Sequence, residues 1–378
     1  MRFSFTDEQD QFRGVLRRFL AAQSPSTAVR QAMASATGYD RASWQRMNNT
    51  LGFAGIHVSE DAGGAGFGYQ ELGIVMEEMG RALCCAPYLG SAVLATEALK
   101  NGATRAEQAE FLPALVSGER TATLAWMEAG DRWHTDAIAM KARESADGYL
   151  LDGVKRYVVD GHTADVVIVA AYAPAASGAT DIALFAVQAG SSGLERRLLT
   201  TTDQTRKLAE LSFHAVPARR LGEGGPAAAA LARTLEHAAV AVAHEMVGAA
   251  QALLESTVEY AKLRMQFGRP IGSFQAVKHK CAAVLLEVEL AKAAVYYAAA
   301  AQDEEDPQAP ALASMAKALA SEAALRAGTE AIQIHGGIGF TWDHDTHLWF
   351  KRVQSTAVLL GDAAWHRERY LNLTAATA

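Results

Sequence analysis

The chain of 378 residues contains few cysteines, no excess of positive charge and no long apolar run. Its three cysteines, Cys84, Cys85 and Cys281, have the spacing of neither a disulfide framework nor a metal site, which suits a reducing compartment. The formal net charge of −7 argues against nonspecific binding to nucleic acid. No segment resembles a membrane span, and the first residues lack the apolar stretch of a signal peptide. We therefore expect a cytoplasmic protein without a metal site, a nucleic-acid partner or a membrane span.

Apolar residues in helical spacing are what the sequence has in quantity. Hydrophobic residues make up 50% of the chain and charged residues 20%, which is enough apolar surface for a sizeable core in two or three domains. Before residue 120, apolar residues recur every three or four positions in five stretches, at 8–23, 41–51, 69–82, 90–101 and 105–117. These stretches predict an N-terminal helical domain over residues 1–119.

The pattern changes to an alternation of apolar and other residues between about 120 and 220. Short runs of this kind lie at 121–126, 148–153, 157–159, 165–171, 182–187 and 209–213. Strands of this length and density, with Gly and Asp turns between them, are typical of a small barrel or sandwich. We predict an α+β protein with a β domain over residues 120–220 and, because helical spacing then returns, a C-terminal domain resembling a four-helix bundle over residues 221–378.

The longest helical pattern runs from Leu231 to Ala261, and glycines and a proline between 268 and 272 end it. A second apolar helix begins after Phe274, so two long helices meet at a turn that carries Arg264 and Gln275. An arginine at a helix end is suited to binding a phosphate or an acidic neighbour. Because these alanine-rich helices are apolar over more surface than one small bundle covers, we expect partner helices from other subunits.

Two motifs resemble the signatures of the acyl-CoA dehydrogenase family of flavoproteins. They are Arg264-x-x-Phe267-Gly followed by Phe274-Gln275, and Gln333-Ile-His-Gly336-Gly337. The resemblance extends over almost the whole chain, and the order helical, β, helical is also that of the family. It implies FAD as the cofactor, an acyl-CoA thioester from fatty acid, steroid or other lipid catabolism as the substrate, and electron-transfer flavoprotein as the electron acceptor. It further implies a dimer of dimers, either a homotetramer or an α2β2 heterotetramer with a paralogue.

The resemblance also implies which residues contact FAD. The positions that match family contacts to its adenine-diphosphate end, across a subunit interface, are Arg264, Phe267, Gln275, Gln333, Gly336 and Gly337. In the β domain, the positions that match contacts to the flavin ring are Met127, Tyr157 and Val159. There the chain departs from the family, since Met127-Glu128-Ala129 replaces Thr-Glu-Pro and Tyr157-Val158-Val159 replaces Trp-Ile-Thr. The lost hydroxyl groups predict less specific contacts, with backbone amides and the aromatic Tyr157 remaining.

Both positions at which the family carries its catalytic glutamate, Leu360 and Ala238, are apolar in this chain. Acyl-CoA dehydrogenation removes an α-proton while hydride leaves the β-carbon for the flavin, so it needs a carboxylate of raised pKa. Glu245 remains on the long helix, seven residues beyond Ala238 and hence on nearly the same face. Its helical neighbours are small or apolar, namely Ala241, Val242, Gly248 and Ala249. Glu245 is therefore the candidate base.

Several alternatives stay open. Asp362, which follows Gly361, is the second candidate base. If the chain has no competent base, Glu245 is a buried structural residue that pairs with an arginine or histidine. The chain is then a non-catalytic or FAD-sharing partner subunit of a heterotetrameric acyl-CoA dehydrogenase. A different flavin oxidation on the same fold, such as nitroalkane oxidation or hydroxylation, is a further hypothesis. The basic residues 351–352 and 366–369 predict a solvated helix face.

Overall fold

The computed structural model describes residues 5–130, 133–146, 148–174, 180–222 and 227–375, and the chain forms two compact units. One unit, called here the helical unit, comprises Met1–Gln31, Gly68–Cys84 and Ala239–Ala378. The other, called here the barrel unit, comprises Ala32–Phe67 and Cys85–Ala238. No helix in the described ranges is long and apolar enough to cross a membrane.

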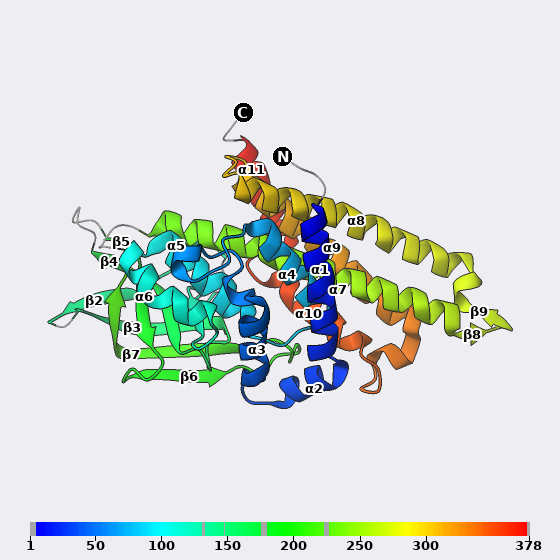
Figure 1. The fold of residues 1–378 in the computed structure, drawn as a ribbon, viewed down its shortest axis with the longest axis horizontal. Coiled ribbons are helices and arrows are strands. Elements are labelled where there is room, and N and C mark those ends of the chain that lie inside the picture. The colour runs from blue at the N-terminus through cyan, green and yellow to red at the C-terminus, as the bar shows by residue number, and fades with distance from the viewer. Residues whose placement is uncertain (1–4, 131–132, 147, 175–179, 223–226, 376–378) are drawn as a thin grey trace. The chain divides into compact units, whose positions relative to one another are not determined.

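Among the described residues, seven strands form the sheet of the barrel unit (Figure 1). They are β1 (Ala122–Ala125), β2 (Lys141–Ser145), β3 (Gly148–Val159), β4 (Val166–Pro174), β5 (Thr180–Gln188), β6 (Leu194–Leu198) and β7 (Leu208–Arg220). Strands β4, β2, β3, β7 and β5 pair in that order, and β5 pairs again with β4, so the sheet closes into a ring. Alternate residues of these strands, among them Val167, Phe185 and Phe213, fill its interior. The predicted central β-barrel is confirmed.

Two strands were not predicted, and their composition explains why. Strand β2 reads Lys-Ala-Arg-Glu-Ser and β6 reads Leu-Glu-Arg-Arg-Leu, so neither carries the alternating apolar residues of a half-buried strand. Strand β2 is held by pairing with β3, and β6 by pairing with β7. Both strands form because a longer neighbouring strand with more apolar residues provides the backbone hydrogen bonds that hold them.

The helices α3 (Arg41–Leu51), α5 (Thr96–Gly102) and α6 (Arg105–Val116) of the barrel unit lie in predicted stretches. Helix α2 (Ser26–Ala34), which spans residues of both units, was not predicted. The stretch predicted as one helix over 90–101 begins instead as a π-helix, η3 (Tyr88–Ala95), and continues as α5. The Thr96 hydroxyl donates to the carbonyl of Ser91, five residues back, which matches the wider turn.

The helical unit contains the long helices. They are α1 (Asp7–Gln23), α4 (Tyr69–Arg81), α8 (Gln275–Asp303), α9 (Ala309–His335), α10 (Thr346–Val358), α11 (Ala363–Ala375) and the greater part of α7 (Ala228–Leu263). A two-stranded hairpin, β8 (Met265–Gln266) and β9 (Arg269–Pro270), joins α7 to α8, as Figure 1 shows at one end of the two helices. The prediction of two long helices meeting at a turn is confirmed, with a short hairpin as the turn. The order of a helical, a β-barrel and a helical region is confirmed as well.

Glycines allow α4 and α7 to pack at backbone distance within the helical unit. A Cβ atom added at Gly248 would lie 1.9 Å from the carbonyl oxygen of Glu77, and one added at Gly80 would lie 2.1 Å from that of Glu245. One added at Gly73 would lie 2.4 Å from the ring of His244. No side chain fits at Gly80 or Gly248 without moving a helix, and none fits at Gly73 without moving the ring of His244. The crossing therefore fixes the backbone of Glu245 and of its neighbour His244.

Candidate functional site

Glu245 lies in the core of the helical unit and is paired with a buried arginine. Its side chain is 5% exposed, and its Oε1 accepts a hydrogen bond of 2.5 Å from the Nη1 of Arg352 on α10. A neighbouring guanidinium stabilises the ionised carboxylate and makes it a weaker proton acceptor. The basic pair 351–352 was predicted to face solvent, and for Arg352, which is only 4% exposed, that prediction was wrong. The sequence did carry a signal for this burial. Arg352 lies four residues after Leu348 and therefore on the same face of α10 as that buried leucine.

Asp362, the second candidate base, lies directly before helix α11. Its Oδ1 accepts a hydrogen bond of 2.8 Å from the backbone N–H of Trp365, as a helix N-cap does. The backbone before Asp362 is held by Lys317 of α9. Its buried ammonium donates to the carbonyl oxygens of Ala357 and Gly361, and also to the hydroxyl of Ser321. Burial lowers the pKa of Lys317 to about 7, while the charge of Asp362 opposes that shift. Asp362 therefore faces a basic group and caps a helix.

Leu360 and Ala238, the apolar residues at the two positions where a catalytic glutamate was expected, are both buried. Leu360 is 6% exposed and has a φ of +62°, a left-handed conformation that costs a leucine about 1 kcal/mol or more. The ring of His366 contacts its carbonyl oxygen at 3.1 Å. His366 is 2% exposed, so the predicted solvated face is wrong here too. Burial lowers the pKa of His366 to about 3. Ala238 is fully buried.

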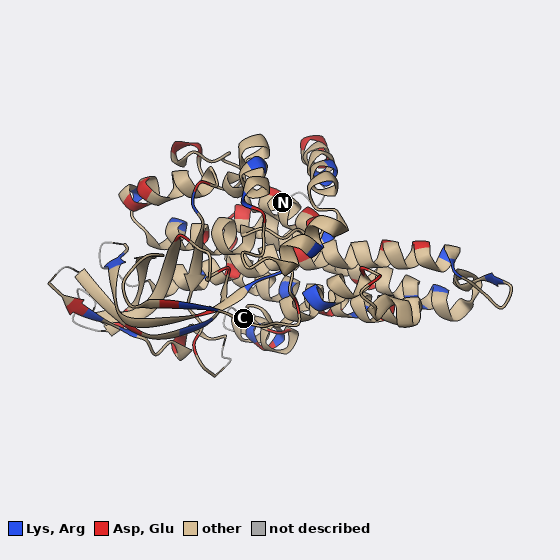
Figure 2. Cartoon of the chain, turned by 90° about the horizontal axis from the view of Figure 1, so that it is seen from below, with Lys and Arg blue, Asp and Glu red and all other residues tan. Residues whose placement is uncertain are grey.

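The candidate cofactor residues in and beside the hairpin are exposed. Phe267 is 90% exposed with a φ of +52°, and Arg264 and Gln275 are exposed as well. Within the described ranges, the side chains of Arg264 and Gln275 make no hydrogen bond or ion pair. Figure 2 shows basic residues, drawn blue, at this end of the two helices. A free guanidinium beside exposed amide and aromatic groups is suited to a diphosphate or to a partner chain.

The glycine turn after α9 lies near the same hairpin. Tyr260 on the last turns of α7 donates to the carbonyl of His335 at 3.4 Å, and the two rings stack at 4.3 Å. His335 is followed by Gly336, whose φ is +66°, and Gly337. A Cβ added at either glycine would meet no atom within 4 Å, so the backbone is open to a ligand or a neighbouring chain. Gln333, one turn earlier, is exposed.

The β-domain candidates lie on β3 and just after β1. Met127 and Val159 are buried at 9% and 3% exposure, and Tyr157 is half-exposed with a φ of +53° at an irregularity in the pairing of β3 with β7. The carbonyl of Met127 accepts from the N–H of Arg156, so the two segments are neighbours. Within them, the buried Lys155 donates to Glu128 at 2.6 Å, and burial lowers the pKa of Lys155 to about 8 although Glu128 opposes the shift.

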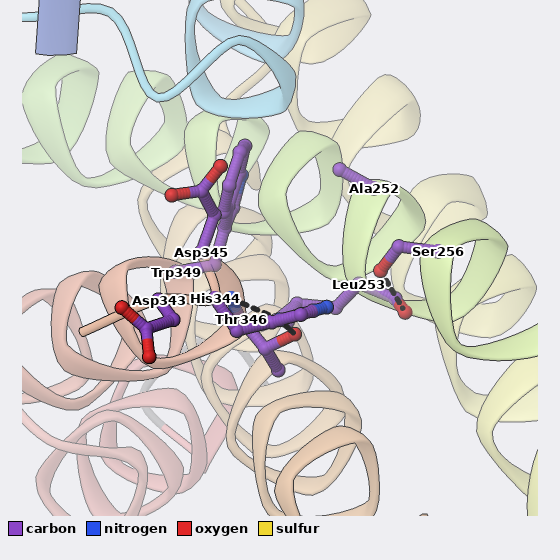
Figure 3. A pocket seen from close by; sticks show the side chains of 8 residues that line it. All are labelled: Ala252, Leu253, Ser256, Asp343, His344, Asp345, Thr346 and Trp349. Carbon is purple, nitrogen blue, oxygen red and sulfur yellow. Dashed lines mark hydrogen bonds between the residues drawn. The ribbon is translucent and has the colours of Figure 1, made fainter. Parts of the chain in front are cut away.

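A cavity of about 330 Å³ lies within the helical unit, between α7 and the segment that leads into α10 (Figure 3). Its lining residues are Ala252, Leu253, Ser256, Asp343, His344, Asp345, Thr346 and Trp349. The ring of His344 lies 4.8 Å from that of His335, so the cavity adjoins the glycine turn. Nothing in the sequence predicted it, because its two walls are about ninety residues apart.

The chain matches known proteins over nearly all its length. Residues 6–119 match the family description "Acyl-CoA dehydrogenase, N-terminal domain", and residues 227–371 match "Acyl-CoA dehydrogenase, C-terminal domain". The chain is 35% identical over 355 residues to "Acyl-CoA dehydrogenase IpdE2" of Mycobacterium tuberculosis, covering 94% of this chain and 93% of that protein.

Two solved structures are also similar. "Tcur3481-Tcur3483 steroid ACAD G363A variant" is 32% identical, with a TM-score of 0.88 and 98% of each chain covered. The "ChsE4-ChsE5 complex from Mycobacterium tuberculosis" is 29% identical, with a TM-score of 0.89 and 100% of each chain covered. The similarity thus extends over both units of the chain.

Proposed function

Because this chain belongs to the acyl-CoA dehydrogenase family, whose members use FAD, we propose that it acts in the α,β-dehydrogenation of an acyl-CoA thioester as one subunit of a tetramer. The observation that carries this proposal is the group of exposed side chains and the open glycine turn around the β8–β9 hairpin. Exposed guanidinium and amide groups without partners among the described residues are suited to a cofactor shared with a neighbouring subunit.

FAD supplies the acceptor for the β-hydride when it is bound. We propose that Arg264, Gln275 and Gln333 bind its adenine-diphosphate end with the backbone of Gly336 and Gly337, and that Phe267 packs against it. Met127, Tyr157 and Val159 are the proposed contacts to the flavin ring. The half-exposed phenol of Tyr157 supports that role, whereas burial of Met127 and Val159 leaves mainly their backbone atoms to contribute. Electron-transfer flavoprotein is the proposed electron acceptor.

Glu245 is the proposed proton acceptor of this chain, with Asp362 as the alternative. Its burial among small apolar neighbours supports the assignment, because a dry site favours the protonated carboxylic acid. Arg352 opposes it, because the guanidinium has to move away before Glu245 gains basicity. The helix-capping bond of Asp362 opposes the alternative in the same manner.

The ion pair of Glu245 with Arg352 favours a second candidate function, that of a partner subunit. In this form the chain contributes FAD-binding residues, and a paralogue contributes the base. The similar ChsE4-ChsE5 structure is named as a complex, which supports testing an α2β2 assembly beside a homotetramer. The similarity to a protein named a steroid ACAD makes a steroid-derived acyl-CoA the first substrate to test.

Stopped-flow reduction of the bound flavin by acyl-CoA, with and without a co-purified paralogue, separates the two forms. If Glu245 is the base, Glu245→Gln keeps the flavin and lowers the reduction rate at least about a hundredfold, and Asp362→Asn lowers it far less. Near wild-type reduction by the Glu245→Gln protein removes Glu245 from the mechanism. A wild-type chain that is reduced only with the paralogue supports the partner subunit, and no reduction in either case overturns the proposed function.

A further inference from the structure

The backbone of the glycine turn closes around the side chain of His335. After α9 the turn continues as η6 (Gly336–Phe340), a short 3-10 helix. A Cβ atom added at Gly339 in this helix would lie 2.8 Å from the Cβ of His335, which is closer than two such atoms can approach. His335 itself is 4% exposed. The turn is therefore open on its outer side and packed against His335 on its inner side.

Two rings hold His335 from separate parts of the chain. Tyr260 of α7 stacks on the imidazole, with ring centroids 4.3 Å apart and planes 23° apart, and donates its hydroxyl to the carbonyl of His335 at 3.4 Å. His344, in the segment before α10, places its ring 4.8 Å from the same imidazole. Ring pairs at this separation stabilise a structure beyond the apolar area that they bury. His335 therefore joins the ends of α7 and α9 to the segment that enters α10.

Backbone partners fix the orientation of both imidazoles. The Nδ1 of His335 lies 2.7 Å from the carbonyl oxygen of Ala331, which can only accept, so Nδ1 carries the proton. The Nδ1 of His344 accepts from the N–H of Thr346 at 3.2 Å and contacts the hydroxyl of that residue (Figure 3). Arg30 of α2 donates to the carbonyl of His344 at 3.2 Å. Neither ring can turn without losing a hydrogen bond, so the contact between them is a fixed part of the turn.

The closed turn favours a neutral His335. Burial lowers its pKa, the hydrogen bond to the carbonyl of Ala331 opposes that shift, and His344 adds to it. Tyr260 and His344 are the titratable groups that face the ring among the described residues, and the carboxylate of Asp345 beyond them is paired with the arginine of α2. Opening the turn returns the imidazole to solvent, where its pKa is about 6.5. A fall in pH below that value therefore favours the open turn, because the open form binds the extra proton.

We propose that His335 is a positioning residue: held between Tyr260 and His344, it keeps the glycine turn in the conformation that binds the diphosphate of FAD. The inference rests on the proposed function, in which the backbone of Gly336 and Gly337 contacts that diphosphate. Because His335 is buried, it acts through this backbone and not by contact with the cofactor. A turn that is in its binding conformation only part of the time has an apparent affinity lowered by that fraction. Loss of the ring should therefore speed the release of FAD.

Release of FAD from the holoprotein after dilution, followed by flavin fluorescence, tests this role. His335→Leu removes the ring, and release should become about fivefold to tenfold faster, a change of the size that one aromatic pair accounts for. His335→Phe keeps a ring against Tyr260 and should stay within about twofold of wild type. Tyr260→Leu and Tyr260→Phe should give the same pair of results from the other side of the stack, and they decide the question if His335→Leu does not fold.

The matched control is His244→Leu, which removes another buried histidine beside a tyrosine ring of the helical unit. His244 lies about 24 Å from Tyr260 along α7, so its loss should leave the release rate unchanged. Urea unfolding of the same proteins separates positioning from folding. Release that follows the loss of unfolding free energy in His244→Leu as it does in His335→Leu would assign His335 a structural role only and overturn the proposal.

Acid supplies a second measurement. In wild type, release should accelerate as the pH falls from 7 to 5, whereas His335→Phe cannot take up the proton and should accelerate less. Equal acceleration of the two proteins, or wild-type release from both His335→Leu and Tyr260→Leu, would overturn the proposal. Reduction of the flavin by acyl-CoA reports the proposed function separately. Normal reduction with unchanged release removes only the role of His335, and the expected release without any reduction removes only the dehydrogenation.

Discussion

The crossing of α4 with α7 and the turn after α9 both depend on glycine, but in opposite ways. At the crossing, Gly80 and Gly248 have neighbouring backbone atoms about 2 Å from where a Cβ would lie. At the turn, a Cβ added at Gly336 or Gly337 would meet no atom within 4 Å. The first pair serves contacts inside the chain, and the second leaves space that the chain itself does not fill. The difference separates residues that hold the fold from residues that are available to something outside it.

The largest effect is expected from breaking the ion pair beside the crossing. Arg352→Met leaves the carboxylate of Glu245 buried without its partner, which should cost about 3–5 kcal/mol of unfolding free energy. Urea unfolding measures the loss. Arg367→Met, which breaks an exposed pair with Glu322, is the control and should cost less than about 1 kcal/mol. The Glu245→Leu/Arg352→Met double variant should be more stable than Arg352→Met. If it is not, the buried charge of Glu245 is not the cause of the stability lost in Arg352→Met.

Adding one methyl group distinguishes the two kinds of glycine directly. Gly248→Ala places a carbon against the backbone of Glu77, and the helices have to separate, which should cost about 3 kcal/mol. Gly337→Ala enters open space and should change the unfolding free energy by less than about 0.5 kcal/mol. Both values come from chemical denaturation at fixed FAD concentration. Equal losses for the two variants would contradict the comparison.

The crossing should also weaken in acid. Burial, with a smaller contribution from Arg13, lowers the pKa of His244 to about 3, whereas its pKa in the unfolded chain is about 6.5. Between these values the unfolded chain binds the extra proton, so stability falls as the pH falls. From pH 7 to pH 5 the share of His244 is about 2 kcal/mol. Between pH 7 and pH 5, the unfolding free energy of the His244→Leu protein should therefore fall by about 2 kcal/mol less than that of wild type. An equal fall in the two proteins would show that His244 does not cause the loss of stability.

The smallest effect on stability is expected at the open end. Arg264→Ala removes an exposed side chain that has no hydrogen bond or ion pair with the residues the structure describes. In excess FAD the unfolding free energy should therefore stay within about 0.5 kcal/mol of wild type. Flavin content after gel filtration should nevertheless fall severalfold, because the guanidinium is proposed to bind the diphosphate. Lys262→Ala, an exposed substitution two residues earlier, should retain its flavin. Protein that stays fully yellow after Arg264→Ala would remove Arg264 from the cofactor site.

The sequence predicted the parts of the fold that depend on neighbouring residues. Apolar spacing from Leu231 to Ala261 predicted α7, and the glycines and proline after Phe267 predicted where it ends, since both signals are local. The charged strands β2 and β6 were missed because their pairing, not their composition, holds them. The boundaries proposed at residues 119 and 220 stay predictions.

For the site, the exposure of Arg264 agrees with its proposed role, whereas the neighbours of Glu245 were only partly foreseen. Pairing with an arginine or histidine was one of the alternatives. That the partner is Arg352 depends on α10 packing in the core of the helical unit, 107 residues further along the chain. No spacing rule joins such distant positions, and the cavity at Trp349 has the same origin.

The helical unit is assembled from the first 31 residues, the segment 68–84 and the last 140. During synthesis, α1 and α4 therefore emerge long before α8 to α11, the helices with which they share a core. The barrel unit has all its strands once residue 220 has emerged. We expect the barrel to form on the ribosome while α1 and α4 still expose apolar faces, which makes them the segments that chaperones bind during synthesis.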